Sequence, residues 1–104
     1  MKSPDRWVML KIVSEEFGTV YKLFMGDYGG WAGSDSWNLN SGIKKIIETE
    51  KTYEVFGYSG STYICYKNSE GMSMYMQSIL SNFVDKLGDA ISVVTPEEVV
   101  KAMV

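Results

Sequence analysis

Histidine is absent from the 104 residues of this chain, and cysteine occurs once, at Cys65. Without histidine there is no Ser-His or Cys-His nucleophile pair, and the usual proton shuttle and most types of zinc site are excluded. The remaining possibility is a reaction catalysed by carboxylates, tyrosine or lysine alone, and the spacing of these residues indicates no particular reaction. We therefore expect that the protein is not an enzyme, and we predict no catalytic residue, metal site or cofactor.

The single cysteine and the charge pattern also limit the environment and the partners. One cysteine excludes an intrachain disulfide bond, which favours a reducing, cytoplasmic environment. The net charge is −3, from 10 basic and 13 acidic residues, and no five like charges are adjacent. This small net negative charge argues against nucleic-acid binding, which depends on a basic surface. No apolar run has the length of a membrane span or the pattern of a signal peptide, so we expect a soluble protein with no membrane partner.

The residues that are present indicate an ordinary globular composition, with 45% apolar residues. At this length we expect one domain that spans residues 1–104. Alternating apolar residues and clusters of β-branched and aromatic residues predict strands. The expected strands are 7–13, 19–25, 36–40, 43–49, 52–58, 62–67 and 90–94. The first two are expected to form a hairpin, and residues 36–67 an antiparallel meander.

Two helices are expected in the second half of the chain. Apolar residues recur at spacings of three and four from Met72 to Leu87, and Gly88 follows as a typical C-terminal cap. Thr95, Pro96 and Glu98 form a capping box with proline at the first helical position, which predicts a short helix over 96–103. The resulting class is α+β. We expect an antiparallel sheet of five to six strands, one long amphipathic helix packed on one face, and a short C-terminal helix.

A glycine-rich stretch over 26–42 is the clearest candidate for a binding surface. It holds five glycines and three aromatic residues, and the stretch 57–71 repeats part of its pattern. Exposed tryptophan and tyrosine side chains are favoured at binding hot spots, and nearby polar groups add specificity. The candidate binding residues are Tyr28, Trp31, Asp35, Trp37, Asn38, Tyr58 and Tyr63. The competing interpretation places these aromatic residues in the core and gives the glycines the role of turning the chain.

Other motifs in these segments support simpler interpretations. A phosphate cradle at Gly29–Gly33 would need a following helix or a P-loop lysine, and neither is present. Cys65 lies in the middle of an expected strand with no neighbouring base, which favours an inert, buried thiol. Met74 falls outside the apolar stripe of the long helix, so either it is an exposed, adaptable contact or the stripe is wide, and the wide stripe is the simpler interpretation.

Two runs of residues resemble a known group of proteins. The first runs from Tyr28-Gly-Gly-Trp through Ser34-Asp-Ser-Trp-Asn-Leu-Asn-Ser-Gly to Ile43, and the second from Phe56-Gly-Tyr-Ser-Gly to Lys67-Asn-Ser-Glu-Gly-Met72. They resemble modules of small, uncharacterised accessory proteins of tailed bacteriophages, over about residues 20–85. The resemblance implies expression inside an infected bacterium and interaction with the host, and it implies no particular mechanism.

Two functions from different classes follow as hypotheses. The first is a non-catalytic accessory protein that binds a host bacterial protein and inhibits or redirects it, in host takeover or counter-defence. The alternative is a protein that binds or sequesters a small, nucleotide-type ligand, with aromatic rings stacked on a base and Lys44 or Lys45 at the phosphate. A homo-oligomer that builds the pocket between two chains is compatible with either function.

Overall fold

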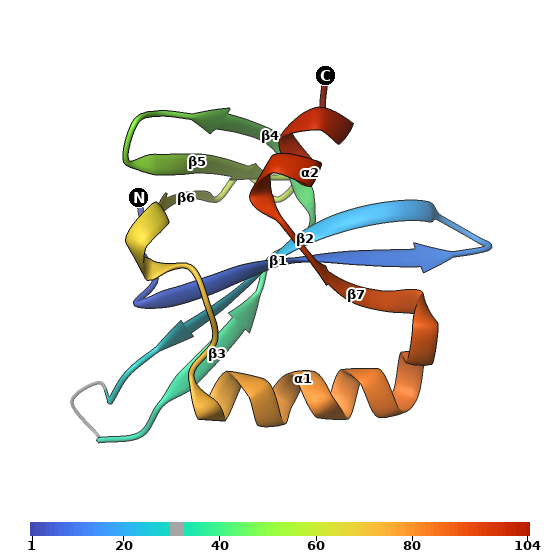
Figure 1. Ribbon diagram of the computed structural model, residues 1–104, viewed down its shortest axis with the longest axis horizontal. Helices are drawn as coiled ribbons and strands as arrows, with labels where there is room; N and C mark the ends of the chain where they lie inside the picture. Colours follow the sequence, from blue (N-terminus) through green and yellow to red (C-terminus); the bar gives the residue numbers. More distant parts are fainter. Residues whose placement is uncertain (30–32) are drawn as a thin grey trace.

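The computed structural model describes residues 1–29 and 33–104 (Figure 1). In these residues it shows an α+β fold of two antiparallel sheets and two α-helices. The first sheet has the order β3-β2-β1-β7 and the second the order β4-β5-β6. The strands are β1 (Arg6–Ser14), β2 (Gly18–Asp27), β3 (Ser36–Leu39), β4 (Ile43–Glu48), β5 (Thr52–Gly57), β6 (Thr62–Tyr66) and β7 (Ile91–Val94). The helices are α1 (Met74–Leu87) and α2 (Pro96–Ala102), with short 3₁₀ turns η1 (Lys67–Ser69) and η2 (Gly88–Ala90).

The β1–β2 hairpin lies between two layers. Figure 1 shows α1 along one side of the first sheet, and the second sheet with α2 on the opposite side. Successive strand residues point to opposite faces, so Trp7 and Met9 pack toward the second sheet while Val8 and Leu10 pack toward α1. Because both faces are covered, all four of these side chains are buried, which makes this end of β1 a continuous apolar run.

Helix α1 approaches β2 closely at a glycine. Met76, the one fully buried residue of α1, lies against Gly26, and a Cβ atom built on that glycine would overlap the Met76 sulfur. Ser73 caps the helix: its Oγ accepts a hydrogen bond from the Met76 N–H at 3.2 Å. The predicted helix therefore begins at Met74, because Met72 precedes this cap. Gly88 has a φ of 55° at the end of the helix, as the sequence predicted.

Helix α2 closes the core on the side of the second sheet. The Thr95 Oγ1 accepts a hydrogen bond from the Glu98 N–H at 3.1 Å, and Pro96 begins the helix, so the predicted N-cap and the proline at the first helical position are confirmed. Among the described residues, the Glu98 carboxylate does not return a bond to the Thr95 N–H, so only this half of the predicted capping box is formed. Val99 is fully buried in the same cluster as Tyr53 and Val55 of β5. No helix in the described part of the chain is long and apolar enough to cross a membrane.

The prediction of a single sheet of five to six strands was wrong. Strand β3 pairs with β2 in the first sheet, and only β4, β5 and β6 form a meander. Buried Asn40 separates the two sheets: its Oδ1 accepts from the Leu23 N–H at 2.8 Å, and its Nδ2 donates to the Gly42 carbonyl at 3.2 Å. Gly42 follows with a φ of 134°, which redirects the chain into β4.

Candidate functional site

The end of the β2–β3 hairpin is held by a network of backbone-to-carboxylate hydrogen bonds. The Tyr28 N–H donates to Asp5 Oδ2 at 2.8 Å, and the Asp5 N–H donates to Asp27 Oδ1 at 3.1 Å. The Gly29 N–H donates to Asp35 Oδ1 at 2.9 Å, so this predicted binding residue accepts a backbone hydrogen bond from the segment that follows β2. The Tyr28 side chain is 54% exposed beside this network. Trp31, another predicted binding residue, lies outside the described residues.

Trp37 is shared between the core and the surface. Its ring packs edge-on against Phe24 of β2 and Phe83 of α1, at centroid distances of 6.1 Å and 5.5 Å. The side chain nevertheless remains 40% exposed. The two interpretations of the sequence therefore both describe this residue: one edge of the indole stabilises the contact between α1 and the sheet, and the other is available to a partner.

The outer edge of β3 is open. Among residues 1–29 and 33–104, strand β3 is the first strand of its sheet and pairs only with β2. The Asn40 N–H donates to the Leu23 carbonyl at 3.0 Å, which fixes the hydrogen-bonding alternation along the strand. Trp37 and Leu39, which are an odd number of residues from Asn40, consequently direct their N–H and C=O groups away from β2, toward the open edge.

Asn38 and Tyr63 come together on the other side of β3. Asn38 precedes Leu39 and points to the face opposite Trp37, where both Asn38 and Tyr63 line a hollow of about 260 Å³. Tyr63 is only 7% exposed, and its ring belongs to the core between the two sheets. The predicted site residues are thus divided by the sheet: Tyr28 and Trp37 present aromatic surface, whereas Asn38 and Tyr63 line a cavity.

Tyr58 and the lysines proposed for phosphate binding lie elsewhere. Tyr58 follows β5, is 67% exposed, and packs beside Gly42. Lys44 and Lys45 are on β4, which lies at the edge of the second sheet opposite β6, the strand of Tyr63. The Lys45 Nζ is 5.5 Å from the centroid of the Phe56 ring, so its charge is held by a cation–π contact on its own sheet.

A group of ionisable residues around Tyr53 was not anticipated from the sequence. The Tyr53 hydroxyl donates to Glu97 Oε1 at 3.4 Å, and the Lys67 Nζ lies 5.1 Å from the Tyr53 ring centroid and 2.6 Å from Glu48 Oε2. Burial, with the charges of Glu97 and Glu48, raises the pKa of Tyr53 to about 12. Burial, with the charge of Glu97, also raises the pKa of Glu70. A phenol with this pKa stays protonated at neutral pH, and its hydrogen bond to Glu97 ties α2 to the second sheet.

Cys65 is a buried thiol, and the carboxylates of the described residues form no metal-binding group. Burial raises the pKa of the Cys65 thiol to about 12, and its side chain is fully buried, so it is an inert core residue as predicted. Across residues 1–29 and 33–104, no three His, Cys, Asp or Glu side chains come together in a way that would hold a metal ion. The chain matches no protein-family model, no curated protein and no solved structure.

Proposed function

We propose that this chain is a non-catalytic accessory protein of a tailed bacteriophage that binds a host bacterial protein through the open edge of β3 and inhibits or redirects it. One observation carries the proposal: an open strand edge is flanked by the half-exposed Trp37 and the exposed Tyr28. Open edges pair with extended segments of other chains, and tryptophan and tyrosine supply much of the energy of protein interfaces. The assignment to bacteriophages rests on the sequence runs described above.

The other sheet edges support this choice. Strand β4 carries Lys44 and Lys45 and a register shift, and such features protect an edge from pairing. The edge of β6 is covered by the N-terminal segment, since the Ile64 N–H donates to the Lys2 carbonyl at 2.8 Å. Strand β7 has neither a lysine nor an aromatic residue. Strand β3 alone combines an undefended edge with exposed aromatic surface, within the part of the chain that the structure describes.

The test is protein capture with variants that block one edge at a time. In Ser36→Lys a lysine stands on β3 opposite Asp27, and in the control Ser92→Glu a glutamate stands on β7 opposite Lys11. Each new charge faces an opposite charge on the neighbouring paired strand, so both variants are expected to fold. From a bacterial lysate, the wild-type chain and Ser92→Glu are expected to retain the same protein, and Ser36→Lys is expected to lose it. Equal recovery with Ser36→Lys, or no specific protein, contradicts the proposal.

A second copy of this chain is the competing occupant of the same edge. Light scattering after size exclusion separates the two cases. A monomer is expected for the wild-type chain, because β3 is only four residues long and two such strands bury little surface. A wild-type dimer that Ser36→Lys converts to a monomer would show that β3 pairs with itself, and the proposed host interface would then be wrong.

A further inference from the structure

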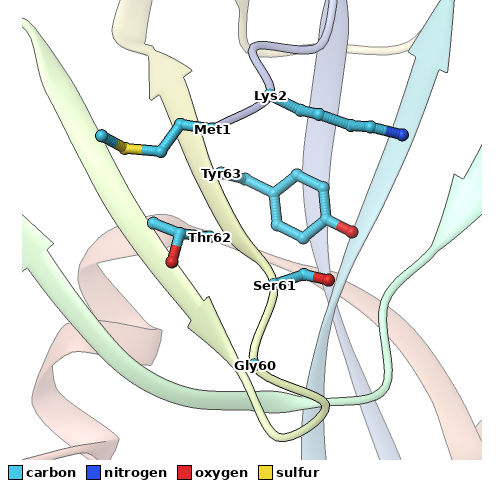
Figure 2. A pocket seen from close by; sticks show the side chains of 6 residues that line it. All are labelled: Met1, Lys2, Gly60, Ser61, Thr62 and Tyr63. Atoms are coloured by element: carbon cyan, nitrogen blue, oxygen red, sulfur yellow. The ribbon is translucent and has the colours of Figure 1, made fainter.

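The hollow of about 260 Å³ lies where the N-terminal segment, the β2–β3 hairpin and β6 meet. Its polar groups come from Lys2, Asp27, Asn38 and Tyr63, and its apolar wall includes Pro4 and Met25. A second hollow, of about 350 Å³, shares Lys2 and Tyr63 as a common wall and extends toward Ser61 (Figure 2). A few convergent polar groups over an apolar wall are typical of a small-molecule site.

Tyr63 gives the strongest indication that the first hollow is a site. The side chain is more than nine-tenths buried, so its ring is fixed by the core. Its hydroxyl group hydrogen-bonds to none of the described residues, and it opens to the hollow instead of being sealed in the core. Figure 2 shows the Tyr63 hydroxyl, the Lys2 side chain and the Ser61 hydroxyl extending toward the same side. A buried ring that presents an unpartnered hydroxyl to a cavity is a pre-positioned hydrogen-bonding group.

The two charged residues that line the hollow are both exposed and form no ion pair with each other among the described residues. The backbone of Lys2 is fixed beside β6, where its N–H donates to the Thr62 carbonyl at 3.4 Å and its carbonyl accepts from Ile64. Asp27 uses one carboxylate oxygen to accept from the Asp5 N–H, which leaves the other oxygen for a further donor. No ion pair joins Lys2 to Asp27, both of which lie in the described ranges. One positive and one negative charge therefore face the same small space without neutralising each other.

We propose that this hollow binds a free α-amino acid as a zwitterion. One cation and one anion give the walls no net charge, which disfavours inorganic phosphate and other simple anions. The volume lies below the usual range for drug-sized ligands, which favours a small ligand. An amino-acid carboxylate meets Lys2 and the Tyr63 hydroxyl, while the ammonium group meets Asp27 and the Asn38 carbonyl oxygen. A small apolar side chain then contacts Pro4 and Met25. The proposal for this site does not depend on whether the β3 edge binds a host protein.

The direct test is a titration of the amide NMR spectrum of the full chain with L-alanine and L-leucine. The amides of Lys2, Asn38 and Tyr63 are expected to shift with a free amino acid. N-acetyl-L-leucine lacks the ammonium group and L-leucinamide lacks the carboxylate, so each is expected to bind at least about tenfold more weakly than L-leucine. Inorganic phosphate and glucose serve as the anionic and the neutral polar probe, and neither is expected to shift these amides.

Variants locate the two charged contacts. Asp27→Asn keeps an acceptor for the Asp5 N–H but removes the charge, and Tyr63→Phe keeps the core ring but removes the hydroxyl. Both are expected to weaken binding of L-leucine by about tenfold, with an unchanged thermal midpoint for Tyr63→Phe. Asp89→Asn on η2 is the matched control and is expected to bind normally. The proposal is wrong if no amino acid shifts these amides at about 10 mM, if phosphate or glucose shifts them equally, or if the variants bind as the wild type does.

Discussion

Single side chains in this molecule show how burial controls ionisation. Cys65 on β6 is fully buried in the core cluster that also holds Tyr53, and the hydroxyl of Tyr53 donates to Glu97 of α2. Burial removes hydration from the charged form of Cys65, and burial together with the charges of Glu97 and Glu48 disfavours the charged form of Tyr53, so the pKa of each group rises to about 12. The two groups therefore remain neutral over the physiological range and act through packing.

These raised pKa values predict a loss of stability at alkaline pH. Below pH 9.0, the ordinary pKa of a thiol, Cys65 is protonated in both the folded and the unfolded chain and has no effect. Above it the unfolded chain releases the proton while the folded chain retains it up to about pH 12, so the free energy of unfolding falls as pH rises. The slope reaches about 1.4 kcal/mol per pH unit for this group, and Tyr53 adds to it above pH 10.0.

Urea unfolding between pH 8 and 10.5 measures this slope. Cys65→Ala removes the thiol and is expected to make the slope shallower, even though the variant is less stable at every pH. The same thiol is expected to react with an alkylating reagent only after denaturation. Rapid labelling of the folded chain, or equal slopes for the two proteins, would show that Cys65 is not sealed in the core.

At the scale of the elements, the periodicity of the sequence predicted most of the secondary structure. The alternation of apolar residues in 7–13 identifies a strand, and the spacing of apolar residues by three and four before Leu87 identifies a helix. Both patterns arise because one face of each element is buried. What the pattern does not contain is the distance between two elements. Gly26 sits inside the predicted glycine-rich stretch, but it is a strand residue that lets Met76 approach the backbone, and only the packing of α1 on β2 shows this.

Gly26→Ala is therefore expected to act on the contact between α1 and the first sheet. The new methyl group overlaps the side chain of Met76, which is fully buried and has to shift within the core, so we expect a loss of about 1–3 kcal/mol in the free energy of unfolding. Chemical denaturation measures the change. In the double variant Gly26→Ala with Met76→Ala, part of the loss is expected to be recovered, as a coupling between touching residues. Strictly additive losses would show that the glycine serves a different purpose.

At the scale of the whole molecule, the sequence predicted the strands but not their partners. Residues 52–58 alternate clearly, and alternation is the same whether a strand pairs with its successor or with β2. The division into two sheets depends on the buried hydrogen bonds of Asn40. The spacing of residues in the sequence does not predict these hydrogen bonds. The candidate site shows the same limit: Asn38 and Tyr63 were both selected from the sequence, yet only the crossing of the two sheets places them at one hollow with Lys2 and Asp27.

The two sheets share one hairpin, which predicts a single unfolding transition. Leu23 of β2 is fully buried in the cluster that joins the first sheet to β5, β6 and α2, while its neighbour Phe24 belongs to the cluster under α1. Loss of Leu23 therefore weakens a strand on which both layers depend. Leu23→Ala is expected to lower the free energy of unfolding by about 2–5 kcal/mol, whereas Val13→Ala at the exposed end of the hairpin is expected to change it by about 0.5 kcal/mol or less.

Amide hydrogen exchange distinguishes a shared core from two separable layers. If unfolding is cooperative, Leu23→Ala lowers the protection of Val55 in the second sheet and of Leu10 in the first by the same free energy, equal to the loss found by denaturation. A selective loss at Val55, with Leu10 still protected as in the wild type, would mean that the second sheet opens on its own. In that case the hollow beside Tyr63 would open with it, and ligand affinity would fall in Leu23→Ala in proportion to the open population.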